Sequence, residues 1–315
     1  MIATVTANPC IDKTVTVERF DLYAMNRVEV LRLDPSGKGI NVSKVLHAFG
    51  CESICTGFDF SKGGKSPLVA DLNTLGIKHD FLTLPGELRL CTKIFDESRK
   101  HTVEVNERGE SVTEADGAAL LAKIQEVAKR CAFLTLSGSL PRGLDKDFYA
   151  KCVAAVKAAA PACRVVVDCE GELLLNALEE APYFIKPNIH EFEKTFGCKI
   201  QAVDELDAQV QALLARYGVE MICVSLGEKG AYISTRQEAY FAKPAKVEVR
   251  SLQGAGDAMV AGLCMALERN LPLADVLRYG VAASGATIAT EGTLPGERAH
   301  FEKLLQSGLD VTKIR

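Results

Sequence analysis

Short apolar segments alternate with longer amphipathic segments from about residue 110 onward, and this alternation constrains the fold more than any other feature of the sequence. Four apolar segments have the length and β-branched content of buried strands: 131–136, 164–169, 183–186 and 221–226. Helical periodicity is found in the segments around them: 113–130, 145–159, 170–178, 188–196 and 204–217. Strands and helices that alternate in this way form right-handed βαβ units. The sequence therefore predicts an α/β fold with a doubly wound sheet.

The first third of the chain has a different pattern. Four segments alternate apolar and polar side chains as half-exposed strands do: 14–19, 27–34, 89–96 and 101–107. We infer a small, mostly antiparallel sheet that is built from two discontinuous segments, about 14–35 and 88–108, and projects from a single domain of residues 1–315. The pattern leaves open whether this sheet is a lid over a site or a dimerisation surface.

Charge and cysteine usage exclude several classes of function. The net charge of -4 gives no support to nucleic acid or an acidic membrane as the main partner. The eleven cysteines form no C-x-x-C pair, and because their number is odd they cannot all form disulfides with one another. We therefore expect reduced thiols in a cytoplasmic protein. Met1 leads directly into a strand-like segment, and no apolar run approaches ~18 residues, so we expect neither a secretory leader nor a membrane span.

The segment Gly254-Ala255-Gly256-Asp257 follows a predicted strand at 247–252 and opens a predicted helix at 256–269. Glycines let successive N–H groups point at one spot, and a helix N-terminus adds unpaired donors that suit an anion. An ionised Asp257 could accept a proton from a substrate hydroxyl. The alternative is an ordinary helix start, where Asp is common. No Walker-type or dinucleotide-binding glycine pattern is present.

Three further clusters have the same character. In the segment 36–41, Lys38 and Asn41 can donate to sugar or phosphate oxygens, and glycines allow close approach. In the segment 186–191, Asn188 and Glu191 can hold Mg²⁺ through water or, equally, form a helix capping box. The glycine-punctuated segment 225–230 is either a turn or the edge of a nucleotide site.

In this order, these clusters resemble the ribokinase-like carbohydrate kinases, and within them the phosphofructokinase B family. The matching motifs are Asn8-Pro9, the Gly-Lys-Gly-Ile-Asn-Val segment at 37–42, Ser137–Pro141, Lys186–Glu191, Val224–Gly227 and Gly254–Asp257. The resemblance implies a three-layer α/β/α sandwich with a small β-sheet lid that often mediates dimerisation. It further implies ATP- and Mg²⁺-dependent phosphorylation of a ketose phosphate, with fructose 1-phosphate preferred and tagatose 6-phosphate the alternative substrate.

The resemblance also implies a role for each matching residue. The sugar would be held by Asp12, Gly37, Lys38, Asn41 and Ser139, and its phosphate by Arg27 and Arg89. Asp257 would be the base, with the N–H groups of Gly254, Ala255 and Gly256 as the anion hole. Asn188 and Glu191 would organise Mg²⁺, and the nucleotide would contact Lys186, Asn188, Ser225, Gly227 and Gly230.

The sequence departs from the family pattern at three places: Ser36 replaces a glycine, Leu252-Gln253 precedes the base motif, and Ala258 follows it. A second class of function stays open, a non-catalytic sugar-phosphate or nucleotide sensor on the same scaffold. An intact Asp257 favours the kinase, because a sensor needs no base.

Overall fold

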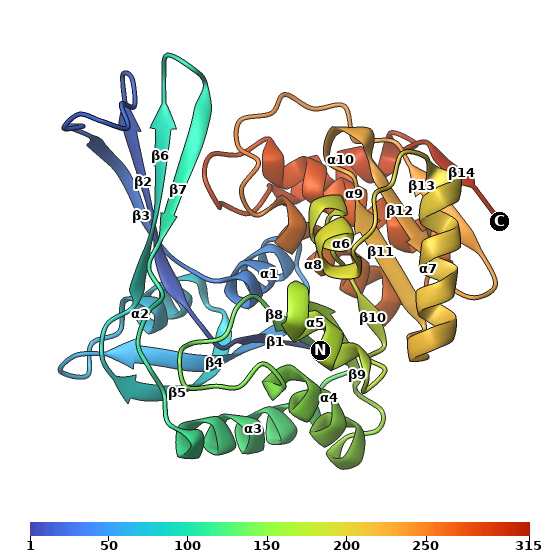
Figure 1. The fold of residues 1–315 in the computed structure, drawn as a ribbon, viewed down its shortest axis with the longest axis horizontal. Helices are drawn as coiled ribbons and strands as arrows, with labels where there is room; N and C mark the ends of the chain where they lie inside the picture. Colours follow the sequence, from blue (N-terminus) through green and yellow to red (C-terminus); the bar gives the residue numbers. More distant parts are fainter.

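The computed structural model describes residues 1–315, in which ten strands form one central sheet (Figure 1). From one edge to the other they are β14 (Val311–Lys313), β13 (Ala239–Ala242), β12 (Ala231–Ser234), β11 (Met221–Ser225), β10 (Phe184–Ile185), β9 (Arg164–Asp168), β8 (Phe133–Ser137), β1 (Ile2–Thr6), β4 (Ser53–Ser61) and β5 (Lys78–Pro85). The seven strands from β11 to β5 run parallel, and β12 to β14 extend the sheet as antiparallel strands.

Helices cover both faces of this sheet, which gives the predicted three-layer sandwich (Figure 1). One face carries α1 (Lys38–Ala48), α8 (Ala255–Glu268), α9 (Leu273–Ile288) and α10 (Arg298–Gln306). The other carries α2 (Pro67–Leu75), α3 (Glu114–Ala128), α4 (Phe148–Ala159), α5 (Gly171–Leu178), α6 (Ile189–Phe196) and α7 (Val203–Tyr217).

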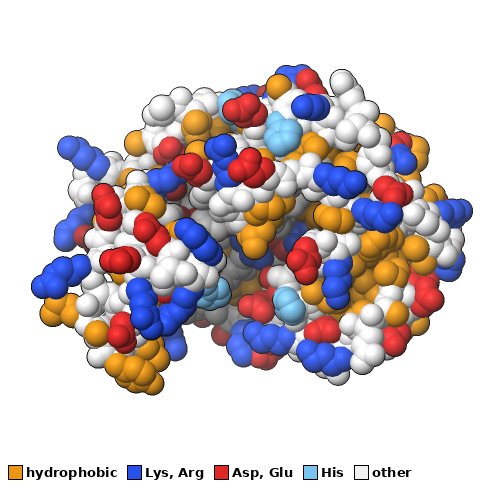
Figure 2. All heavy atoms as spheres, turned by 90° about the horizontal axis from the view of Figure 1, so that it is seen from above, with side chains coloured by type: hydrophobic (Ala, Val, Ile, Leu, Met, Phe, Trp, Pro, Cys, Tyr) orange, Lys and Arg blue, Asp and Glu red, His pale blue; other side chains and the backbone are white.

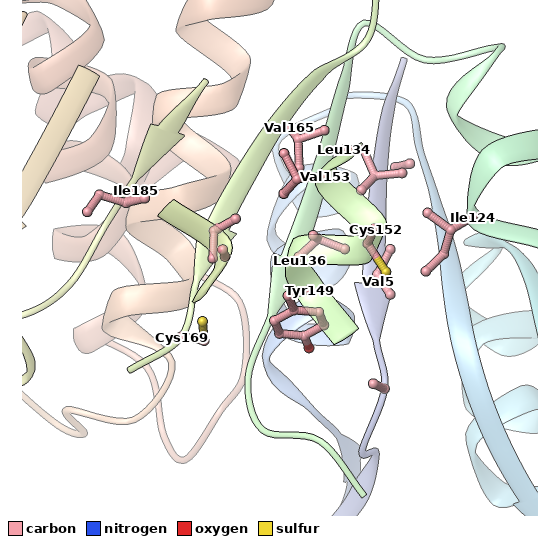
Figure 3. Close-up of a cluster of buried hydrophobic side chains, with 14 of the residues drawn as sticks. Val5, Ile124, Leu134, Leu136, Tyr149, Cys152, Val153, Val165, Cys169 and Ile185 are labelled. Atoms are coloured by element: carbon pink, nitrogen blue, oxygen red, sulfur yellow. The ribbon is translucent and has the colours of Figure 1, made fainter. Parts of the chain in front are cut away.

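Alternate residues of the parallel strands enter opposite cores, so both faces of each strand are apolar. Ile2 packs with α1 and α8, for example, whereas Val5 packs with the helices of the other face. Figure 3 shows part of this second core, where Leu136 of β8 lies beside Tyr149 of α4, and Leu134 lies at the level of Val153. The buried Tyr149 hydroxyl donates to the carbonyl of Ser137 at 3.2 Å, which satisfies its polar end.

A separate four-stranded sheet, called the small sheet below, stands beside the main body (Figure 1). Its order is β3 (Glu29–Ser36), β2 (Cys10–Val17), β6 (Arg89–Asp96) and β7 (His101–Asn106). Only the β2–β6 pair is parallel, so the sheet is mostly antiparallel, as predicted. Along the chain, the first strand of the small sheet is β2. It begins at Cys10, four residues before the predicted start at residue 14, and Asp12 therefore lies inside the small sheet.

The strand predicted at 247–252 is absent, and residues 243–253 form an irregular connection. The apolar side chains that suggested a strand, Val249 and Leu252, are exposed to 55% and 75%. No neighbouring strand pairs with this segment through backbone hydrogen bonds. The alternation of apolar and polar residues alone is therefore not enough to form a strand. The other predicted elements after residue 110 are present, with boundaries that differ from the predicted ones by at most three residues. None of the helices combines the length and the apolarity needed to cross a bilayer.

Candidate active site

A cleft of about 740 Å³ opens between the small sheet and the carboxyl ends of the central strands. Figure 2 shows the molecule hollowed between the small sheet on its left side and the main body. Most predicted site residues line this cleft: Asp12, Gly37, Lys38, Asn41, Arg89, Lys186, Asn188, Glu191, Ser225, Gly227, Gly230 and Gly254 to Asp257. Ser139 lines an adjoining hollow that shares Gly37, Lys38 and Arg89 with the cleft.

Arg27 is the predicted site residue that the structure does not bring to the cleft. It lies in the irregular segment before β3, and its side chain is exposed. Arg89 pairs with Cys10 at the start of β2, whereas residues 18–28 connect the far end of β2 to β3. The length of β2 therefore separates the two arginines, and only Arg89 reaches the cleft of its own chain.

Asp257 lies in the first turn of α8, and Gly254 is the N-cap residue of this helix. Gly254 has φ 72°, a left-handed conformation that a residue with a side chain adopts only at a cost. No side chain caps the helix, so N–H groups of its first turn remain available at the cleft. The Asp257 side chain is buried, and its Oδ2 accepts a hydrogen bond from Asn41 Nδ2 at 2.8 Å. A carboxylate and free N–H donors thus meet at one point.

The environment of Asp257 shifts its proton affinity. Burial raises its pKa to about 6, against the lowering effect of the Lys38 ammonium; Asp168 also raises it, and the hydrogen bond from Asn41 and the Lys186 charge lower it. A carboxylate with a pKa near the working pH is better suited to accept and release a proton than an ordinary aspartate.

Behind Asp257, two lysines share one buried carboxylate that the sequence analysis did not identify. Asp168 ends β9, and its oxygens lie 3.4 Å from Lys186 Nζ and 3.5 Å from Lys38 Nζ. Burial would raise the pKa of Asp168, but Lys186 and Lys38 together keep it below its usual range. Its place at the carboxyl end of a central parallel strand was the available signal, because open α/β sheets bind ligands there.

Lys38 lies between the buried Asp168 and the surface of the cleft. Its Nζ also lies 3.7 Å from Oε1 of Glu191. Burial alone would lower the pKa of Lys38, but the carboxylates of Asp168, Glu191 and Asp257 outweigh burial and raise it. Lys38 is therefore a permanent cation facing the point where Asp257 and the helix N–H groups meet.

Asn188 and Glu191 form the capping box that their spacing allowed. Asn188 Oδ1 accepts from the Glu191 N–H at 2.9 Å, and Glu191 Oε2 accepts from the Asn188 N–H at 2.8 Å. The amide oxygen of Asn188 is thus engaged in the cap, whereas Glu191 Oε1 faces the cleft beside Lys38. An isolated bridge pairs Asn188 with Ser225, which joins two of the predicted clusters.

The small sheet supplies a second ion pair to the cleft. Asp12 Oδ2 lies 3.0 Å from Nζ of Lys93, and both side chains are largely buried. Lys93 was not predicted, although its inward position on a half-exposed strand could have indicated it. The guanidinium of Arg89 donates to the carbonyls of Asn8 and Glu107, which fixes it at the rim.

A more apolar cavity of about 870 Å³ adjoins the other end of the cleft. Its lining includes Leu226, Phe241, Val249, Leu252 and Ile288. Gly227 and Ala255 line both cavities, so a long ligand could lie across the two. The arrangement offers an apolar site, an anion site and a polar site in succession.

Comparison with known proteins identifies the family of this chain. Residues 5–299 match the family described as pfkB family carbohydrate kinase. A 1-phosphofructokinase of Bacillus subtilis is 34% identical over 92% of this chain and 93% of its own, and one of Vibrio cholerae is 30% identical over 97% and 95%. In fold, the chain is similar to phosphofructokinase-2 of Escherichia coli in complex with substrates and products, with a TM-score of 0.90, 24% identity and coverage of 97% and 98%. The chain therefore belongs to the pfkB family of carbohydrate kinases and is a phosphotransferase that uses an alcohol group as acceptor.

Proposed function

We propose that this kinase transfers the γ-phosphoryl group of ATP to fructose 1-phosphate and forms fructose 1,6-bisphosphate. The observation that carries the proposal is a buried Asp257 beside free helix N–H groups and a lysine, in a cleft with a polar and an apolar end. Relatives at 30–34% identity that bear the name 1-phosphofructokinase support this substrate over tagatose 6-phosphate.

The ketose phosphate would occupy the end of the cleft next to the small sheet. Asp12, Gly37, Lys38, Asn41 and Ser139 would hold its hydroxyl groups, and Arg89 would contact its phosphate. The adenine would lie in the apolar cavity, with Lys186, Ser225, Gly227 and Gly230 around the nucleotide. This order would bring the γ-phosphoryl group of ATP beside Gly254, Ala255 and Gly256.

Asp257 would accept the proton of the free primary hydroxyl as its oxygen attacks the γ-phosphorus in line with the leaving ADP oxygen. The N–H groups at the start of α8 would bind the oxygens of the transferring group. Lys38 would add positive charge at the same place. Positioning and charge stabilisation would supply most of the rate, because phosphoryl transfer requires little covalent chemistry from the protein.

The charges present suit Mg²⁺ bound together with ATP. Glu191 Oε1 is free of the capping box and faces the cleft, whereas the two oxygens of Asp168 are paired with Lys186 and Lys38. Glu191, with Asn188 beside it, would hold the ion through water, as Mg²⁺ prefers oxygen ligands and keeps several waters. The bound ion would neutralise charge on the phosphates.

A coupled assay of ADP release tests the substrate. The panel is fructose 1-phosphate, tagatose 6-phosphate, fructose 6-phosphate and fructose, each with ATP and Mg²⁺. We expect the highest kcat/KM for fructose 1-phosphate. A higher value for tagatose 6-phosphate would reassign the substrate, and no turnover of any member would remove the sugar-phosphate proposal.

The pKa of Asp257 predicts an acidic limb in the rate. The base must be ionised, so kcat is expected to fall tenfold per pH unit below the pKa of Asp257 in the substrate complex; in the free protein this pKa is about 6. Because sugar phosphates also titrate near this pH, kcat is measured at saturating substrates, which removes the effect of pH on binding. A kcat that stays constant down to pH 4.5 would contradict the assignment of Asp257 as the base.

Arg89→Ala tests the contact with the substrate phosphate. Charge-assisted hydrogen bonds contribute about 1.5–3 kcal/mol, so KM for fructose 1-phosphate is expected to rise roughly 10- to 100-fold. The change in kcat should be much smaller, since the contact exists in both the ground state and the transition state. Arg142→Ala is the matched control, because Arg142 donates to the carbonyl of Gly109 and does not line the cleft. Equal effects of the two changes would count against a phosphate contact.

We further propose a cytoplasmic homodimer that pairs through the small sheets. Val30, Leu31 and Leu33 of β3 are exposed to 50–59%, which is unusual for apolar side chains that lie together. Leu31→Glu with Leu33→Glu should therefore convert a dimer into a monomer in sedimentation velocity. Pairing of this kind could also bring the exposed Arg27 to the cleft of the other copy. A wild-type protein that sediments as a monomer at micromolar concentration would contradict this.

A further inference from the structure

Two cysteines and an aspartate meet on the inward face of the small sheet. Cys10 and Asp12 are two residues apart on β2, and Cys91 lies directly across from Asp12 on β6. Residues at this spacing point to the same face of a sheet. The sulfur atoms of the two cysteines and a carboxylate oxygen of Asp12 all lie within 4.8 Å of one another.

The dimensions of this cluster fit a tetrahedral metal. Zinc binds thiolate sulfur at about 2.3 Å and carboxylate oxygen at about 2.0–2.2 Å, which puts tetrahedral ligand atoms about 3.5–4 Å apart. Cys10 Sγ lies 3.8 Å from Asp12 Oδ1. The other pairs of ligand atoms lie no more than 4.8 Å apart, so a shift of about 1 Å would bring the set into tetrahedral range.

The charges around the cluster are compatible with a thiolate site. Asp12 turns Oδ2 toward Lys93 at 3.0 Å and leaves Oδ1 toward Cys10, so its two oxygens serve different partners. A hydrogen bond between the two thiols, together with burial, holds the pKa of Cys10 well above its ordinary value, and the same hydrogen bond lowers the pKa of Cys91, so a bound cation must displace both thiol protons. Two thiolates and one carboxylate would more than balance a divalent cation, and the nearby cations would offset the excess negative charge.

The site also has access and an open position. All three side chains are at most 5% exposed, yet all three line the cleft. A cation can therefore enter from the cleft, and its fourth ligand would be water or a substrate oxygen. This is the pattern of a zinc site with three protein ligands.

We propose that Cys10, Asp12 and Cys91 form a binding site for a thiophilic divalent cation, zinc in particular, and that its occupation excludes the ketose phosphate. Binding releases the two thiol protons to solvent and involves no oxidation. The exclusion rests on the proposed function, in which Asp12 holds the sugar, whereas binding of the metal does not. The kinase would then be inhibited by zinc at a site separate from that of Mg²⁺.

Optical titration tests the binding without turnover. Co²⁺ is added to metal-free, reduced protein, and thiolate-to-cobalt charge transfer is followed, with Zn²⁺ then displacing the cobalt. We expect one equivalent per chain in the wild-type protein and loss of the signal in Cys10→Ser with Cys91→Ser. Cys51→Ser with Cys198→Ser is the control, because it removes two partly exposed thiols and leaves the cluster intact. Equal signals from both double variants would overturn the site.

Kinetics test the exclusion. At a free zinc concentration ten times its dissociation constant, the apparent KM for fructose 1-phosphate should rise about tenfold in the wild-type protein and in the control. In Cys10→Ser with Cys91→Ser, zinc should leave the apparent KM unchanged. Each protein is compared with itself before and after zinc, so a change of basal activity in this variant does not affect the comparison. Zinc bound at the cluster with an unchanged KM would overturn the exclusion. Absence of turnover in the presence of Mg²⁺ and without zinc would instead contradict the proposed function, while the titration still decides on the site.

Discussion

Asp257→Asn is expected to reduce kcat by about 10²–10⁴ and to leave the dissociation constant of the ketose phosphate within a few-fold of the wild-type value. Asparagine keeps the shape of the side chain and can still pair with Asn41, but it cannot accept the hydroxyl proton. Calorimetric binding of fructose 1-phosphate and single-turnover rates separate the two effects. An unchanged single-turnover rate would remove Asp257 from the mechanism.

The same substitution should raise stability at neutral pH. Burial raises the pKa of Asp257 to about 6 in the folded protein, against 3.8 as its ordinary value, so the folded state holds this proton more tightly than the unfolded state. Stability therefore falls as pH rises from about 4 to 6, and the whole cost is present above pH 6. Asp257→Asn removes the cost. Its Tm should exceed that of the wild-type protein at pH 7.5 and match it near pH 4.

Asp310→Asn serves as the control for this measurement. Asp310 pairs with Lys243 on the surface, where both side chains are more than half exposed. Its replacement should leave both kcat and the pH dependence of Tm unchanged. A lower Tm of Asp257→Asn at pH 7.5 would mean that the carboxylate stabilises the fold, and that its effect on rate is not purely chemical.

The second large effect is expected for Asp168→Asn. Asp168 is 1% exposed and Lys186 is 3% exposed, so removal of the carboxylate leaves a buried ammonium without its partner. Breaking a buried pair in this way typically lowers the free energy of unfolding by about 3–5 kcal/mol. Lys38 would also lose one of its three carboxylates, which should lower kcat. Urea denaturation and the coupled assay measure the two consequences.

The double variant Asp168→Asn with Lys186→Met distinguishes an unpaired charge from simple loss of contacts. It removes both charges and fills the space with an apolar chain, so it should recover much of the stability lost in the single variant. Activity should not recover, because Lys186 lines the cleft. A single variant within 1 kcal/mol of the wild-type protein would show that the pair contributes little to the fold.

Local sequence determined the elements and the two helix starts of the site. Buried parallel strands need continuous apolar runs, so 131–136 and 164–169 were recognisable without neighbours. The glycines before Lys38 and Asp257 mark helix N-termini because left-handed backbone and free N–H groups are local properties. The capping box of Asn188 and Glu191 was equally local. These features suffice for the fold class, the family and most of the candidate residues.

Only the tertiary structure decided which of these groups meet. Asn41 and Asp257 are 216 residues apart and share a hydrogen bond because α1 and α8 pack on the same face of the sheet. Asp168 belongs to the site because two lysines from other parts of the chain pair with its carboxylate. The strand expected at 247–252 failed for the same reason, since pairing needs a neighbour that the sequence does not specify. Periodicity and turns depend on adjacent residues, whereas burial, ion pairs and shifted pKa values depend on what the rest of the chain places beside them.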